Sequence, residues 1–153
     1  MKKHQIAPRA LHVVDVANEI CSGFFHVEEV EELRNAWNDC VHPGEHDQYF
    51  LATGPGTKEA LAFGWRKAAP VIRAGVDGAD DAIIEYLDVD YIASRFTHVY
   101  IGSGDHKIAP RAAELVKAGV KVTIVGRRGN IHHTYYGIGA EIRFLDDHWV
   151  LAA

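Results

Sequence analysis

The sequence predicts an α/β domain in which a mainly parallel sheet carries helices on both faces. Short apolar runs rich in β-branched residues alternate along the chain with segments of helical periodicity, which is the pattern of successive βαβ units. The length of 153 residues favours one domain over two, so residues 1–153 are expected to form a single unit. The hydrophobic content of 48% is that of an ordinary globular protein.

The first half of the chain predicts three strands. Residues 10–16 are too few for a helix and rich in valine, so they form the first strand. Apolar residues then recur at helical spacing among glutamates from Val27 to Trp37, which predicts an amphipathic helix. The following expected elements are a strand at 48–53, a helix at about 57–67, a short strand at 70–74 and one helix from about 80 to 94.

The second half predicts three more strands around one helix. A strand is expected at 98–102, and a helix then starts near Ile108 and ends with Gly119 as the residue after its C-cap. Residues 120–125 form the next strand, a turn-rich segment follows, and a last short strand lies near 142–145.

Charge and apolar content exclude several classes of protein. The formal net charge of −5 excludes a strongly basic, DNA-coating protein. Two cysteines, Cys21 and Cys40, are too few for a disulfide scaffold and suit a reducing compartment. No apolar run approaches the length of a membrane helix, and no signal-length apolar segment begins the sequence. The expectation is a soluble, cytoplasmic protein with no membrane partner.

Carboxylates follow three of the predicted strands. Asp15 ends the first strand, Asp80 follows the turn after the third, and Asp105 follows the fourth. Ligands of open parallel sheets bind at the carboxyl ends of the strands. Converging carboxylates repel one another unless a cation is present, and carboxylate oxygens suit Mg²⁺ or Mn²⁺. The sequence therefore predicts metal-assisted hydrolysis of a phosphodiester.

Each aspartate also has a structural interpretation. Asp80 and Asp105 are good helix N-caps, since aspartate accepts hydrogen bonds from the first backbone N–H groups. Asp15 is less easily explained in this way, because a carboxylate inside an apolar run is costly to bury.

A local basic segment suggests a nucleic-acid partner. Residues 106–143 contain seven basic and two acidic residues, or +5, which leaves −10 for the rest of the chain. Arg127 and Arg128 directly follow the fifth predicted strand, beside the expected crevice. Tyr135 and Tyr136 come soon after and suit stacking on unpaired bases. The alternative is a solvated loop with ordinary surface charges.

A nucleotide- or sugar-phosphate-binding enzyme on a Rossmann-like sheet is the least supported interpretation. Gly102 and Gly104 follow a strand, as in the glycine-rich loop of dinucleotide-binding domains, but Lys107 stands where the third glycine of such a loop belongs. No glycine-rich loop follows the first strand either.

Three stretches together resemble the NYN domain family of the PIN-like nuclease superfamily. They are Asp15-x-x-Asn18, Asp77-Gly-Ala-Asp80 before a helix, and Tyr100-Ile-Gly-Ser-Gly-Asp105 before a helix and a Gly-Val-x-Val-Thr strand. The similarity covers almost the whole chain and is best between residues 71 and 128. It implies a PIN-like three-layer α/β/α sandwich with a central mainly parallel sheet, and metal-dependent endoribonuclease activity on RNA.

The resemblance also implies roles for individual residues. Asp15, Asp80 and Asp105 would be the catalytic acids that bind Mg²⁺ or Mn²⁺, and Asn18 and Ser103 would shape the site around them. The residues expected to contact the substrate are Asn18, Ser103, Lys107, Arg127 and Arg128.

Lys107 departs from the family pattern, because many members have an aspartate there. Two interpretations stay open: the lysine contacts the scissile phosphate of a working ribonuclease, or it weakens metal binding in a non-catalytic RNA- or protein-binding module. The sequence also leaves a homodimer open, with an exposed Trp37 or Trp65 as the contact.

Overall fold

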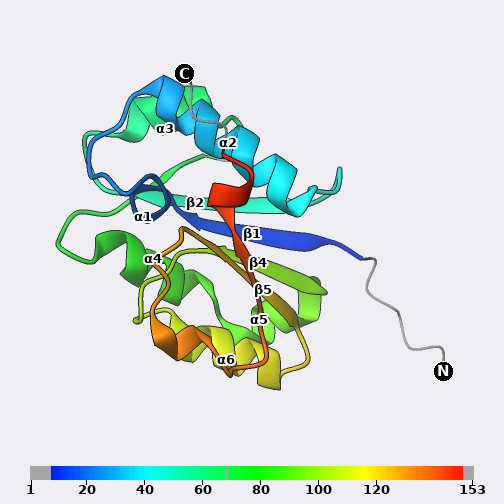
Figure 1. The fold of residues 1–153 in the computed structure, drawn as a ribbon. Coiled ribbons are helices and arrows are strands. Elements are labelled where there is room, and N and C mark those ends of the chain that lie inside the picture. The colour runs from blue at the N-terminus through cyan, green and yellow to red at the C-terminus, as the bar shows by residue number, and fades with distance from the viewer. Residues whose placement is uncertain (1–7, 68, 150–153) are drawn as a thin grey trace.

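A six-stranded, entirely parallel sheet forms the centre of the molecule (Figure 1). The structure is a computed structural model that describes residues 8–67 and 69–149. The strands are ordered β3-β2-β1-β4-β5-β6 across the sheet. Their bounds are β1 (Ala10–Asp15), β2 (Gln48–Thr53), β3 (Val71–Ile72), β4 (His98–Gly102), β5 (Lys121–Gly126) and β6 (Glu141–Phe144).

Helices cover both faces of this sheet. The bounds are α1 (Val16–Ile20), α2 (Val27–Val41), α3 (Lys58–Gly64), α4 (Gly78–Tyr86), α5 (Val89–Arg95) and α6 (Ala109–Lys117), with short 3₁₀ turns η1 (His133–Tyr135) and η2 (Leu145–Asp147). Helices α2 and α3 lie above the sheet in Figure 1, and α4, α5 and α6 lie below it. Two apolar cores fill the spaces between these layers. The predicted α/β sandwich is confirmed.

The segment predicted as one helix at 80–94 is two helices. Helix α4 ends at Tyr86, and the fully buried Leu87 leaves helical geometry with ψ of 57°. The Asp88 carboxylate then accepts a hydrogen bond from the Tyr91 backbone N–H at 2.8 Å and caps α5. A continuous helix was wrong because Asp88 stabilises a new N-terminus more than it stabilises a helix interior.

The end of α6 agrees with its prediction. Gly119 follows the C-cap with φ of +88°, a conformation that glycine adopts at low cost. Strand β5 then starts at Lys121 and pairs with β4.

The strand order places a crevice between β1 and β4. From β1 the chain moves outward through β2 to β3, then returns to β4 on the other side of β1 and continues through β5 to β6. The direction of winding therefore reverses between β1 and β4. In open α/β sheets, ligands bind at such a switch point, beyond the carboxyl ends of the two strands.

The two tryptophans proposed as dimer contacts are buried. Trp37 is fully enclosed, and its indole N–H donates to Nδ1 of the buried His12 at 3.0 Å. Trp65 packs edge-on against Trp37 with 6.0 Å between ring centroids and is 1% exposed. The expectation that either is exposed was wrong, since the core between sheet and helices takes both rings.

No helix in the described ranges is long and apolar enough to span a bilayer.

Candidate functional site

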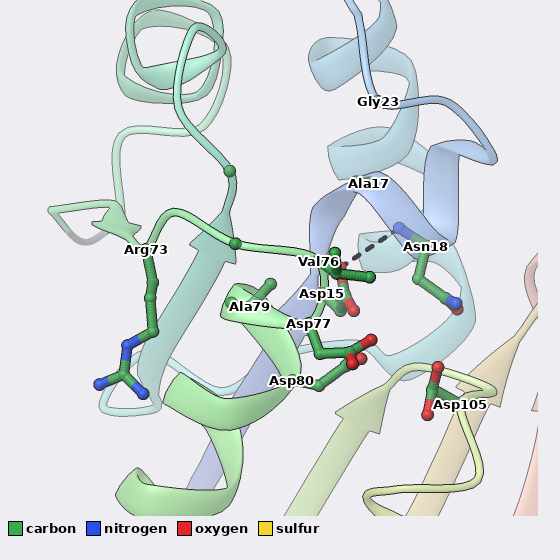
Figure 2. Close-up of a pocket in the computed structure, with 13 residues that line it drawn as sticks. Asp15, Ala17, Asn18, Gly23, Arg73, Val76, Asp77, Ala79, Asp80 and Asp105 are labelled. Atoms are coloured by element: carbon green, nitrogen blue, oxygen red, sulfur yellow. Dashed lines mark hydrogen bonds between the residues drawn. The ribbon is translucent and has the colours of Figure 1, made fainter.

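A pocket of about 290 Å³ lies at the carboxyl edge of the sheet, at the switch point between β1 and β4. Asp15, Asp80 and Asp105 all line it, so the structure brings together the three aspartates singled out from the sequence. Asn18 and Asp77 line the pocket as well. Figure 2 shows the carboxyl groups of these four aspartates, Asp77 included, pointing toward the same space.

Asp15 is a buried carboxyl at the junction of β1 and α1. It is 5% exposed, and it accepts a hydrogen bond from the Asn18 backbone N–H at 3.2 Å, which caps α1. Its side chain also interacts with that of Asp80. Burial raises the pKa of Asp15 to about 8, and the contact with Asp80 adds to the shift.

Asp80 completes this carboxyl pair from the first turn of α4. It is 7% exposed, and its Oδ1 is buried without a hydrogen-bond partner among the described residues. Burial raises its pKa, and the charge of Asp105 raises it further. Two carboxyl groups in contact need either a shared proton or a cation between them. The pair therefore holds either a shared proton or a cation.

Asp105 faces the pair from the loop after β4. Its Oδ1 accepts a hydrogen bond from the Lys107 backbone N–H at 2.8 Å, and its own N–H donates to Ser103 Oγ at 3.2 Å. Helix α6 starts later, with Ile108 as its N-cap and no side-chain cap. Asp105 is therefore not the cap of that helix, and its second carboxylate oxygen has no hydrogen bond from the described residues.

Asn18 ties the loops around the pocket together. Its Oδ1 accepts a hydrogen bond from the Gly104 N–H at 3.0 Å, and its carbonyl oxygen accepts one from Asn130 Nδ2 at 3.4 Å. The Asn18 backbone N–H also donates to the Asp15 carboxylate, which caps α1. With Ser103 holding the Asp105 backbone, these contacts fix the distance between the two sides of the crevice.

Lys107 lies at the edge of the pocket, where its Nζ donates to the carboxylate of Asp77. Asp77 lies directly before α4 and lines the pocket, although the sequence analysis gave it no role of its own. The contact with Asp77 raises the pKa of Lys107, so this cation is held beside the acidic pocket.

Arg127 and Arg128 form ion pairs outside the pocket. Arg127 pairs with Asp146 at 3.0 Å and donates to the Glu19 carbonyl oxygen. Arg128 makes a two-oxygen contact with Asp147 at 2.7 and 2.9 Å. Neither arginine lines the pocket that holds the aspartates. They fasten the turn after β6 to the end of β5, so the structure does not bring these two predicted substrate contacts to the site.

Tyr135 is also placed differently from its expected stacking role. The ring is fully buried, and its hydroxyl donates to the Asp105 carbonyl oxygen at 2.6 Å. Burial raises the pKa of Tyr135 far above its ordinary value, which keeps the hydroxyl a donor. Tyr135 thus holds the backbone of the loop that carries Asp105. The neighbouring Tyr136 is 57% exposed.

Glu19 is a buried acid that the sequence analysis missed. It is 0% exposed, and neither carboxyl oxygen has a hydrogen-bond partner in the described part of the chain. Burial raises the pKa of Glu19 well above its ordinary value, and the charge of Asp15 raises it further. Its position three residues after the buried Val16 places both on one face of α1, a spacing that signalled its burial.

Glu19→Gln is expected to stabilise the protein at about pH 8 by about 1 kcal/mol or more. The folded state holds the Glu19 proton above the pH at which the unfolded chain releases it, so wild-type stability falls as the pH rises past about 4.5. Glutamine has no proton to lose. Urea unfolding of both proteins at about pH 5 and about pH 8 measures the difference. The exposed Glu45→Gln is the matched control, and an equal gain at both pH values would contradict the argument.

The carboxylate oxygens of Asp15, Asp80 and Asp105 are ligands of the kind that binds a divalent ion. Within residues 8–67 and 69–149, no three His, Cys, Asp or Glu side chains are already arranged as a metal cage. Mg²⁺, however, commonly takes one or two carboxylates and completes its shell with water and substrate phosphate oxygens. The buried, unpartnered Oδ1 of Asp80 beside Asp15 is a ligand atom of that kind.

The chain matches no known protein-family profile and no curated protein sequence. It is similar in structure to a protein of unknown function from Vibrio parahaemolyticus, with a TM-score of 0.65 and 14% sequence identity. The match covers 99% of this chain and 100% of that chain. It supports the fold of the whole domain.

Proposed function

We propose that this protein is a metal-dependent ribonuclease that hydrolyses RNA phosphodiester bonds at the acidic pocket. The observation that carries the proposal is the buried Asp15–Asp80 carboxyl pair, which lies with Asp105 in one pocket at the switch point of the sheet. Such a group binds positive charge, and a phosphodiester brings negative charge that only a cation can bridge to carboxylates.

Each residue of the site has a distinct task. Asp15, Asp80 and Asp105 would hold Mg²⁺ or Mn²⁺, which supplies the positive charge that activates a water molecule and stabilises the charge developing on the phosphate. Asn18 keeps Asp15 and the Gly104 loop at a fixed separation. Lys107 offers a cation to the substrate phosphate from the pocket edge.

The local structure argues against a bound dinucleotide. The strand order is the one used by dinucleotide-binding domains, where the pyrophosphate lies on the helix after β1. Here the Asp15 carboxylate occupies the N-cap of that helix, which is only five residues long. A carboxyl at this position fills the space and takes up a backbone N–H that a pyrophosphate would need.

A non-catalytic RNA- or protein-binding module is the second candidate. The contact between Lys107 Nζ and Asp77 favours it, because a lysine that neutralises an acid at the pocket edge reduces the attraction for a metal ion. A pure binding module needs no metal, so metal binding separates the two candidates.

We expect the purified protein to cleave single-stranded RNA in Mn²⁺ or Mg²⁺ and to lose all cleavage in EDTA. The experiment incubates a mixed panel of RNA and DNA oligonucleotides with each metal and resolves the products on a gel. Isothermal titration of Mn²⁺ alone is expected to show binding to the wild type and about tenfold or greater weakening in Asp80→Asn. Mn²⁺ binding without any cleavage of the panel would overturn the nuclease, and no Mn²⁺ binding at all would favour the binding module.

A further inference from the structure

The acidic pocket continues along the surface into a second groove. Asn18 and Asp105 line both, so the groove directly adjoins the pocket. The groove has a volume of about 270 Å³, and its far wall is formed by residues 129–131 and by the rings of His106 and His132.

Beyond the two histidines lies a hollow of about 410 Å³. His106 and His132 line this hollow as well as the groove, with 5.3 Å between their ring centroids. The rest of its lining is mainly apolar and comes from α6, from η1 and from the turn after η1: Ala109, Pro110, Ala113, Thr134 and Ile138. The pocket, the groove and the hollow thus lie next to one another, with carboxylates at one end, two imidazole rings between and apolar side chains at the other end.

His132 is held in a fixed orientation. Its Nδ1 accepts a hydrogen bond from the Thr134 backbone N–H at 3.3 Å and lies 2.9 Å from Thr134 Oγ1. The neutral ring therefore carries its proton on Nε2, which is left to donate to a ligand. A fixed aromatic ring costs little entropy when a flat ligand stacks on it.

We propose that this hollow binds one nucleobase of a single-stranded RNA whose neighbouring phosphate lies at the aspartates. A base has flat apolar faces and a polar edge, and this hollow offers it two histidine rings beside alanine and proline side chains. The sugar-phosphate backbone then follows the groove past Asn18 to Asp105. This inference rests on the proposed function, because it takes RNA as the substrate.

The first test measures RNA binding in Ca²⁺, which supplies the positive charge between phosphate and carboxylates, and a gel checks that the RNA stays intact during the measurement. Fluorescence anisotropy with a short fluorescein-labelled single-stranded RNA gives the Kd. Ala113→Phe, which fills the hollow, and His132→Ala, which removes the stacking ring, are each expected to raise the Kd about tenfold. The matched controls Ala118→Phe and His46→Ala are exposed and line neither groove nor hollow, so they are expected to bind like the wild type.

The second test replaces one nucleotide of the RNA at a time with an abasic site. The wild type is expected to lose about tenfold in affinity at one position, and His132→Ala is expected to lose nothing further there. Equal affinities for intact and abasic RNA, or wild-type binding by Ala113→Phe and His132→Ala, would overturn the base-binding hollow.

The two proposals fail in different ways. If the wild type cleaves RNA in Mn²⁺ while the hollow variants bind as it does, the hollow is wrong and the nuclease stands. If the wild type neither binds nor cleaves RNA, both are wrong.

Discussion

Asp15→Asn is expected to lower the rate of RNA hydrolysis by at least about 10³-fold while leaving the folded protein more stable than the wild type at neutral pH. The rate falls because an amide no longer supplies the negative charge that binds the cation. The fold survives because asparagine caps helices as well as aspartate does, so the Asn18 N–H keeps its acceptor. The new amide N–H₂ is also expected to donate to the neighbouring Asp80 carboxylate.

The gain in stability depends on pH in a defined direction. Burial raises the pKa of Asp15 from 3.8 to about 8. Between these values the unfolded chain releases the proton and the folded chain keeps it, so wild-type stability falls as the pH rises. Asparagine has no proton to release. Its advantage is therefore near zero at about pH 4 and reaches roughly 5 kcal/mol at about pH 8, since each of the about four pKa units corresponds to about 1.4 kcal/mol.

The measurement pairs initial rates of RNA cleavage with urea unfolding at both pH values. Asp80→Asn and Asp105→Asn are expected to lose the same activity. The matched control is Asp81→Asn, because Asp81 is the exposed neighbour of Asp80 on α4 and does not line the pocket. Cleavage that persists in Asp15→Asn would contradict the mechanism. An equal loss of activity in Asp81→Asn would contradict the assignment of catalysis to the three pocket aspartates.

The parts of the site that follow strands could be predicted from the sequence. Asp15 and Asp105 follow apolar runs whose length and β-branching indicate strands, and parallel strands place such residues at one edge. Asp80 was found by the same argument, although β3 is only two residues long. The sheet order supplies the rest, since β1 and β4 become neighbours and bring Asp15 and Asp105 to one crevice.

The residues in irregular segments could not be placed from the sequence. Arg127 and Arg128 lie beside the crevice along the chain, but the turn after β6 folds back and supplies Asp146 and Asp147 as their partners. No periodic pattern predicts such a pairing across 19 residues. Tyr135 shows the same limit, because an aromatic ring suits both a buried position and stacking on a base, and the residue type alone does not distinguish the two. Long-range packing decides these cases.

Gly104→Ala is expected to lower the free energy of unfolding by about 3 kcal/mol or more and to abolish hydrolysis in the protein that remains folded. A Cβ on Gly104 would lie 1.7 Å from the Asn130 carbonyl oxygen and 2.9 Å from the Ile131 Cα. Both neighbours are backbone, so no side-chain rotation relieves the overlap. The loop at 129–131 and the loop that carries Asp105 must move apart.

That separation breaks the contacts that hold the site. Gly104 donates to Asn18 Oδ1 at 3.0 Å and accepts a hydrogen bond from the His132 N–H at 2.9 Å. Moving Gly104 therefore shifts Asp105 away from the Asp15–Asp80 pair, and a displacement of about 1 Å at a reacting centre costs about 10²-fold in rate. The loss of activity is thus expected even where the variant stays folded.

Gly54→Ala is the matched control, because Gly54 lines the same pocket with nothing within 4 Å of an added Cβ. It is expected to keep wild-type activity and to gain up to about 1 kcal/mol from the reduced freedom of the unfolded chain. Urea unfolding and RNA cleavage of both variants check the pair. Equal stability and activity in Gly104→Ala and Gly54→Ala would show that the close approach of the two loops does not position Asp105.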